Sequence, residues 1–167
     1  QSIETGHLLL GILEVDKEVT PYLLRKLQVN QNMMRSALDR IVESYPKVSG
    51  GNVYLSQQLG RILNYALNEM KKFGDEYVSI ELLVYSLLDA TDAIGQLLKD
   101  NGISKNSLKQ AIMDLRKGEK VNSQGQEGTY QSLEKYPKAP STPIIHFTDL
   151  GVKIEPFTQS FQSEIPN

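Results

Sequence analysis

Two carboxylates, Asp75 and Glu81, have the spacing in this chain that best suits a functional site. Both flank the turn between two predicted helices, and Glu81 falls in the first turn of the second helix. A carboxylate at a helix start gains roughly 0.3–1 kcal/mol from the helix dipole, so physical reasoning alone favours a structural role for Glu81. The functional alternative is that the two carboxylates border an apolar groove lined by Leu63, Tyr65 and Leu82.

The remaining reactive side chains do not form a catalytic set. The only imidazoles are His7, expected to make a polar contact at a helix start, and His146, which lies among β-forming residues near the C-terminus. The sequence has no Cys and contains none of the motifs GxxxxGK[ST], GxGxxG, HExxH or GxSxG. We therefore expect a non-catalytic protein with no metal site and no cofactor, which neither binds nor hydrolyses ATP.

The charge balance argues against two classes of partner. The chain has 18 basic and 20 acidic residues and a formal net charge of −2, which gives no reason to expect binding to nucleic acid or to an anionic membrane. No apolar run approaches the roughly 20 residues that span a bilayer. Together with the absence of Cys, this leads us to expect a soluble, cytoplasmic protein.

The elements that must position Asp75 and Glu81 arise from an internal duplication. Residues 5–41 align with residues 79–115 without a gap, and the apolar positions are kept while surface residues differ. The apolar pairs of identical type are Leu8 and Leu82, Leu9 and Leu83, Leu13 and Leu87, Leu23 and Leu97, Leu24 and Leu98, and Ala37 and Ala111. We expect an all-α fold in which the two copies pack as a pseudo-twofold globule.

The pattern of each copy predicts three helices. A further helix, the longest in the chain, is predicted just before the second copy. This helix is expected to begin after Ser56 and to stop at Gly74, with apolar residues at the i, i+3, i+4, i+7 spacing. Because the sequence begins at Gln1, the first copy has no equivalent of this helix, and we expect that copy to expose an apolar face. The predicted N-caps of the other helices are Thr5, Asn30, Ser79 and Ser104, and a further helix is expected over about 91–101.

Composition divides the chain into three parts. A duplicated helical domain is expected at 1–116, with repeats at about 1–45 and 53–116, followed by a solvated linker at 117–136 and a Pro-containing tail at 137–167. The strand-like runs of the tail are 144–147 and 152–154. The face left uncovered by the missing helix should cause a low melting temperature or self-association, or else be filled by this tail through Ile144, Ile145 and Phe147.

Three runs, 3–13, 56–66 and 74–83, resemble the duplicated N-terminal domain of Clp ATPases. Runs 115–124 and 130–136 are similar to the linker that leads into the first ATPase module of ClpB-type disaggregases. The resemblance covers about four-fifths of the chain. It departs from the family in two places: the family's first helix is absent, with a threonine that the family uses near its substrate groove, and an unrelated tail follows Tyr136 in place of the ATPase module.

The resemblance implies a module that binds exposed apolar segments of unfolded or aggregated proteins and passes them to a hexameric ATPase ring. Matched by position, Asp75 and Glu81 correspond to family residues linked to chaperone activity, while Leu63, Tyr65 and a partly exposed Leu82 correspond to its apolar groove. The alternative is a module that docks a folded adaptor or a degron, as in ClpA- or ClpC-type relatives. The ClpB-like linker favours the first function.

Overall fold

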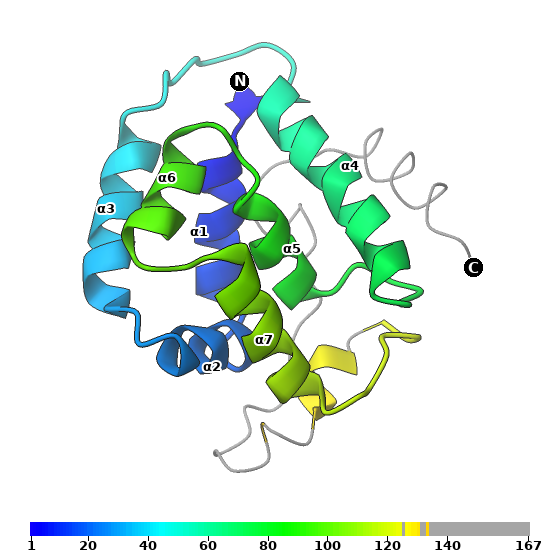
Figure 1. Ribbon diagram of the computed structural model, residues 1–167. Coiled ribbons are helices and arrows are strands. Elements are labelled where there is room, and N and C mark those ends of the chain that lie inside the picture. Colours follow the sequence, from blue (N-terminus) through cyan, green and yellow to red (C-terminus); the bar gives the residue numbers. More distant parts are fainter. Residues whose placement is uncertain (125, 131–132, 134–167) are drawn as a thin grey trace.

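The computed structural model describes residues 1–124, 126–130 and 133 of the chain and confirms the all-α class (Figure 1). The first copy forms α1 (Thr5–Val15), α2 (Val19–Lys26) and α3 (Gln31–Glu43), and the second forms α5 (Ile80–Leu87), α6 (Ala93–Asp100) and α7 (Lys105–Arg116). The long helix α4 (Gln57–Lys72) lies between the copies in sequence, and a short 3-10 helix, η1 (Gln126–Thr129), follows α7.

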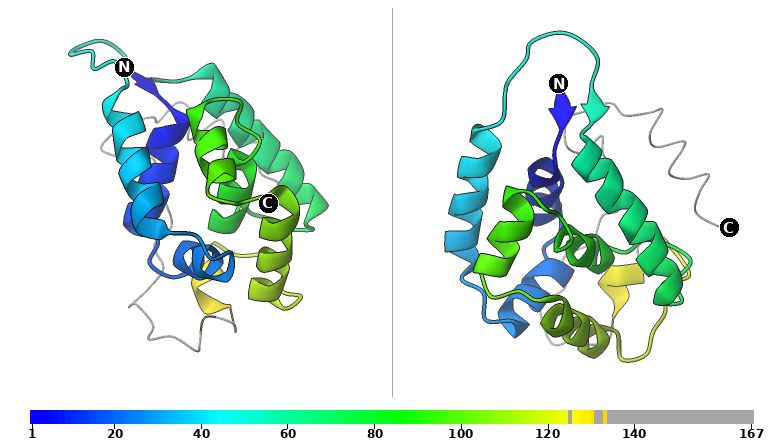
Figure 2. Two further views of the ribbon diagram at one scale, coloured as in Figure 1. Left: turned by 60° about the vertical axis from the view of Figure 1, so that its left-hand side comes forward. Right: turned by 45° about the horizontal axis from the view of Figure 1, so that its top comes forward.

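The helices of the two copies contact each other in equivalent pairs, as a pseudo-twofold arrangement requires. Helix α3 packs on α6 and α2 packs on α7, which are the same pairing with the copies exchanged, and α1 packs on its own counterpart α5. Helix α4 packs mainly along α5, on the side of the molecule opposite α3 (Figures 1 and 2). The expected stripe of α4 is buried, since Leu59, Ile62, Leu63, Ala66 and Met70 are each at most 2% exposed.

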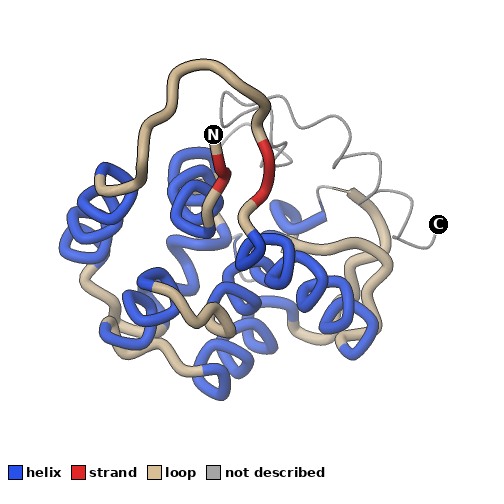
Figure 3. Tube along the Cα trace, turned by 90° about the horizontal axis from the view of Figure 1, so that it is seen from above, coloured by secondary structure: helices blue, strands red, loops and turns tan. Residues whose placement is uncertain are grey.

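Two short strands join the start of the chain to the start of α4. Strand β1 (Ser2–Ile3) pairs in parallel with β2 (Tyr54–Leu55), and the Ser56 amide donates to the Ile3 carbonyl at 2.9 Å. The loop that follows α3 arches over the top of the molecule to reach β2 (Figure 3). This pairing fixes the first residue of α4 relative to α1.

Four predicted helix caps are confirmed, and one is wrong. Asn30, Ser56, Ser79 and Ser104 each accept a hydrogen bond from the backbone N–H three residues later. Thr5 is instead the first helical residue of α1, and its hydroxyl donates to Asp92 Oδ2 at 2.6 Å. Asp92 also accepts from the Ile94 and Gly95 amides, so α6 begins at Ala93, two residues later than predicted.

The segment after α7, predicted to be a solvated linker, folds back onto the helices. Lys117 and Gly118 take left-handed backbone conformations with φ of 48° and 87°, which reverses the chain at the end of α7. Val121 and Tyr130 are then only 1% and 0% exposed, and Leu133 is also buried. Apolar burial outweighs the polar composition on which the solvated prediction relied. We call residues 120–124 and 126–130 the strap; it is drawn in yellow in Figure 1.

The predicted strand-like runs and the residues Ile144, Ile145 and Phe147 lie outside the described residues, as does His146. Among the described helices, none combines the length and the apolar character needed to cross a bilayer.

Candidate functional site

The candidate site begins at the turn between α4 and α5. Gly74, with φ of 74°, ends α4, and the Asp75 amide closes the turn by donating to the Met70 carbonyl at 3.0 Å. Ser79 then caps α5 through a 3.2 Å hydrogen bond from the Leu82 amide, which puts Glu81 in the first turn of α5. Local sequence signals therefore bring both predicted carboxylates to one end of the α4–α5 pair.

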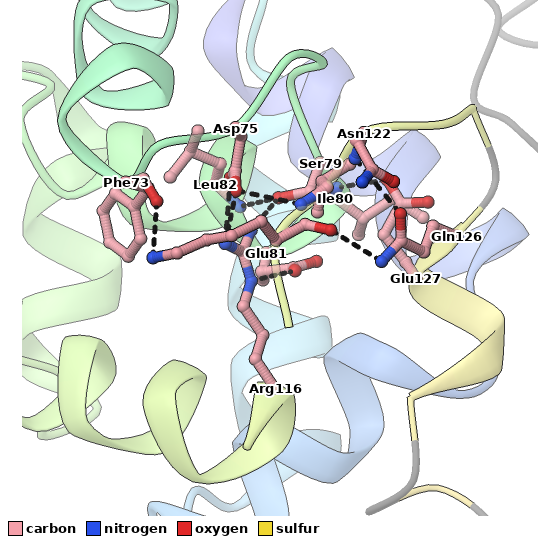
Figure 4. A network of polar contacts seen from close by, with 12 residues as sticks. Phe73, Asp75, Ser79, Ile80, Glu81, Leu82, Arg116, Asn122, Gln126 and Glu127 are labelled. Carbon is pink, nitrogen blue, oxygen red and sulfur yellow. Dashed lines mark hydrogen bonds and ion pairs between the residues drawn. The ribbon is translucent and has the colours of Figure 1, made fainter. Parts of the chain in front are cut away.

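Both carboxylates point inward and bind Arg116, the last residue of α7 (Figure 4). Arg116 Nε donates to Glu81 Oε1 and Nη1 donates to Asp75 Oδ1, each at 2.9 Å. Arg116 Nη2 donates to the hydroxyl of the capping Ser79 at 3.0 Å. One planar guanidinium thus ties α7 to the turn and to the first residues of α5.

Aromatic rings enclose this cluster of charges. The guanidinium carbon of Arg116 lies 5.4 Å from the ring centre of Phe73 and 6.0 Å from that of Tyr130. The Tyr130 hydroxyl donates to Glu81 Oε1 at 2.5 Å. Arg116 is 2% exposed and Glu81 is fully buried, so the charges interact in a region with little water to screen them.

The strap contributes a third carboxylate, Glu127. Its Oε1 accepts from the Ile80 amide at 3.3 Å, at the start of α5. Glu127 is 7% exposed. The cluster therefore holds three buried carboxylates and one buried guanidinium, and full ionisation would leave it with excess negative charge.

This imbalance shifts the proton affinities of the cluster. Burial raises the pKa of Glu81, against the opposing effects of Arg116 and of the Tyr130 hydroxyl. Burial and the charge of Glu81 raise the pKa of Glu127 to about 7. Burial would lower the pKa of Arg116, but the charges of Glu81 and Asp75 outweigh it and raise that pKa. Glu81 Oε2 accepts no hydrogen bond from any described residue, in keeping with its disfavoured charge.

The apolar residues predicted to line a groove lie in different environments. Leu63 is 2% exposed and Leu82 is 0% exposed, so the expectation that Leu82 is partly exposed is wrong. The reason is that Leu82 lies on the inner side of α5, in the same core cluster as Leu63. Tyr65 is half-buried and reaches a polar cluster of its own.

That second cluster lies at the junction of α4 with the end of α5 and the start of α7. Lys105 Nζ donates to the Tyr65 hydroxyl at 2.9 Å and to Asp89 Oδ1 at 2.7 Å, and it lies 4.8 Å from the Tyr65 ring centre. Arg61 Nη1 donates to Asp89 Oδ2 at 2.7 Å. A cavity of about 700 Å³ adjoins the cluster, with Leu88 among its apolar lining residues. The structure thus separates Tyr65 from Asp75 and Glu81, which belong to the Arg116 cluster.

His7 makes the predicted polar contact at a helix start, since its Nδ1 accepts from the Glu4 amide at 2.9 Å. Burial lowers the pKa of His7. Among the described residues, no group of three or more His, Asp or Glu side chains could hold a metal ion.

Sequence reasoning missed Arg116, Glu127 and Tyr130 as members of the site. One signal was present in the repeat: Arg116 aligns with the apolar Val42 of the first copy. A basic residue at a position that is apolar in the other copy suggests a buried charge that needs partners. Asp75 and Glu81 were the available carboxylates at the neighbouring turn.

Comparison with known proteins assigns this fold. The family described as the Clp repeat (R) N-terminal domain matches residues 1–101, which span both copies as far as the end of α6. The chain belongs to the Clp N-terminal domain family. Similarity to curated proteins extends further along the chain than the family match does.

The chain is 43% identical over 136 residues to the chaperone protein ClpB of Bacteroides thetaiotaomicron, a match that covers 81% of this chain and 16% of the relative. It is 38% identical over 136 residues to the ClpB of Porphyromonas gingivalis, with the same coverage. The chain thus spans about one-sixth of the length of these relatives.

A solved structure, the Hsp104 N-terminal domain from Candida albicans, has the same fold. Its TM-score with this chain is 0.62 at 20% sequence identity, and the match covers 73% of this chain and 81% of the other. The ClpB matches cover 136 residues, more than the 101 residues of the family match. The ClpB similarity is therefore not confined to the helical repeats.

Proposed function

We propose that this Clp N-terminal domain is a substrate-binding module, which engages exposed apolar segments of unfolded or aggregated polypeptides in the cytoplasm. The observation that carries the proposal is the 43% identity to a chaperone protein ClpB over 136 residues. The captured segments would pass to the ATPase ring of a hexameric parent chaperone. The domain itself has no phosphate-binding loop in its sequence.

The Tyr65 cluster is our candidate for first contact with substrate. Tyr65 is the one residue of the predicted groove whose side chain reaches the surface, since Leu63, Leu82, Asp75 and Glu81 are buried. The adjoining cavity combines an apolar lining residue, Leu88, with the charged Lys99 and Lys105. Apolar surface supplies affinity for an unfolded chain, and charged neighbours orient it.

Leu63, Leu82, Asp75 and Glu81 act in this proposal beneath the surface. Leu63 and Leu82 pack in the core shared by α4 and α5, while Asp75 and Glu81 tie α7 to the turn between these helices. Together they fix the orientation of the helix that carries Tyr65. Direct contact between these four residues and substrate requires a movement that uncovers them.

The test is binding of a permanently unfolded protein, measured by fluorescence anisotropy with the full chain. We expect Tyr65→Ala to weaken binding several-fold while the far-UV circular dichroism stays unchanged. Tyr54→Ala is the matched control, because Tyr54 is a tyrosine with 61% exposure on β2. Tight binding to a folded adaptor and none to unfolded protein would refute the proposal and support adaptor docking instead.

A further inference from the structure

The strap occupies a surface that could serve another polypeptide. The surface, here called the strap site, consists of Asp75, Glu76, Ile80 and Glu81. It lies at the α4–α5 turn and receives the strap along its length (Figure 4). Asp75 and Glu81 are also the two carboxylates that the sequence placed at the rim of a substrate groove.

The first part of the contact between the strap and the strap site is made by Lys120 and Val121, mostly through main-chain groups. The Glu76 amide donates to the Val121 carbonyl at 2.7 Å, and the Val121 amide donates to Asp75 Oδ1 at 3.0 Å. The Lys120 ammonium adds a 2.8 Å hydrogen bond to the carbonyl of Phe73. Every extended polypeptide carries the N–H and C=O groups that Val121 uses here, so these two hydrogen bonds do not depend on the sequence of the bound segment.

Two further side chains of the strap, Glu127 and Tyr130, make the second part of this contact. The Tyr130 hydroxyl binds Glu81 while its ring lies against the Arg116 guanidinium. The Glu127 side chain accepts from the Ile80 amide at the beginning of α5, where burial and the charge of Glu81 favour its neutral form. The strap site is thus matched to a segment that has an extended apolar residue followed by a helical turn with a neutral hydrogen-bond acceptor and an aromatic hydroxyl.

We propose that the strap site is a polypeptide-binding surface, that the strap is its intramolecular occupant, and that unfolded substrate segments with an apolar residue and a nearby tyrosine compete with the strap for it. The inference rests on the proposed substrate-binding function and adds a site and a substrate class to it. It also gives Asp75 and Glu81 a binding role that their burial under the strap would otherwise exclude.

Competition has a measurable consequence. When a site is open for only a fraction of the time, the apparent dissociation constant rises by the inverse of that fraction. Changes that loosen the strap therefore tighten substrate binding, and changes that fasten it weaken binding. A purely structural strap predicts the reverse for the loosened variant, because a less stable domain binds no better.

The loosened variant is Tyr130→Phe, which removes the hydrogen bond to Glu81 and keeps the ring. A hydrogen bond to a charged group is strong enough that its loss can tighten apparent binding about tenfold, or about 1.4 kcal/mol. The control is Tyr54→Phe, the same change at an exposed tyrosine. Hydrogen exchange of the Glu76 amide, which donates to the strap, reports whether the strap has loosened.

The fastened variant is Glu76→Cys with Asn122→Cys. Both positions are exposed, Glu76 on the strap site and Asn122 on the strap next to Val121, whose carbonyl accepts from the Glu76 amide. The chain has no other Cys, so a short flexible bismaleimide joins these two thiols alone. The probe is a permanently unfolded, fluorescently labelled protein. The same variant without the cross-link is its own control.

We expect the cross-link to weaken probe binding at least about tenfold and Tyr130→Phe to tighten it. Equal binding by the cross-linked and free forms would overturn the strap proposal while leaving the substrate-binding function intact. Absence of probe binding by every form, the unmodified chain included, would instead refute the substrate-binding function together with the inference that rests on it.

Discussion

Replacing Glu127 by Gln should stabilise the domain above about pH 4.5, by an amount that grows until the pH passes about 7. Burial and the nearby charge of Glu81 raise the pKa of Glu127 from 4.5 to about 7 in the folded chain. A group whose pKa is higher in the folded state contributes stability that is complete below the unfolded pKa and is lost as the pH rises through the folded pKa. The loss for Glu127 therefore falls between pH 4.5 and somewhat above pH 7.

The size of the effect follows from the shift. Each pKa unit corresponds to about 1.4 kcal/mol, so ionising Glu127 in the folded state costs about 3 kcal/mol once the shift is complete. Gln is neutral at every pH and keeps a carbonyl oxygen that can accept from the Ile80 amide, as Glu127 Oε1 does. The variant and the parent should thus have similar stability at pH 4.5, and the variant should be more stable by up to about 3 kcal/mol at pH 8.

Urea denaturation of both proteins at half-unit steps from pH 4.5 to pH 8.5 measures this difference directly. Other titrating groups are common to both chains, so the contributions of those that do not interact with Glu127 cancel in the difference. Glu43→Gln, a change at an exposed glutamate, is the control and should give a constant difference near zero. A Glu127→Gln variant that is less stable than the parent at pH 8 would refute the account of the buried cluster given above.

Three further outcomes can be checked by denaturation. Arg116→Met should destabilise the domain by about 3–5 kcal/mol, because it leaves buried carboxylates without their cation, and Arg116→Lys should restore little of this, because an ammonium lacks the planar fork. Gly95→Ala should lower the melting temperature sharply, since an added Cβ would lie 1.8 Å from the Ala90 carbonyl oxygen. Leu82→Gln should unfold much of the population rather than act on binding alone, because it buries an amide at a position with 0% exposure. An unchanged denaturation midpoint in any of the three would contradict the packing described here.

The helical part of the fold could be predicted because its signals are local. The stripe of α4 and the caps Asn30, Ser56, Ser79 and Ser104 depend on residues a few positions apart, which a single sequence displays. The duplication added the order of the helices in the second copy. Thr5 was misassigned because its hydroxyl bonds to Asp92, a partner far along the chain.

The site was predicted only in part for the same physical reason. Asp75 and Glu81 are close in sequence, so their common position could be inferred, but their partner Arg116 lies at the end of another helix. The strap carries few apolar residues, and its burial depends on Val121 and Tyr130 meeting a surface built by α4 and α5. Composition alone does not reveal that complementarity.

The reversal of the chain at Lys117 and Gly118 also decides how the domain would carry a load. Tension applied beyond Tyr130 reaches the helices first through the Tyr130–Glu81 hydrogen bond at the start of α5, before it passes along the backbone of the strap to the end of α7. The strap then has to peel away before α7 is pulled, which releases slack while the helical core stays folded. In a single-molecule pulling experiment this appears as a small extension at low force that precedes the main unfolding step.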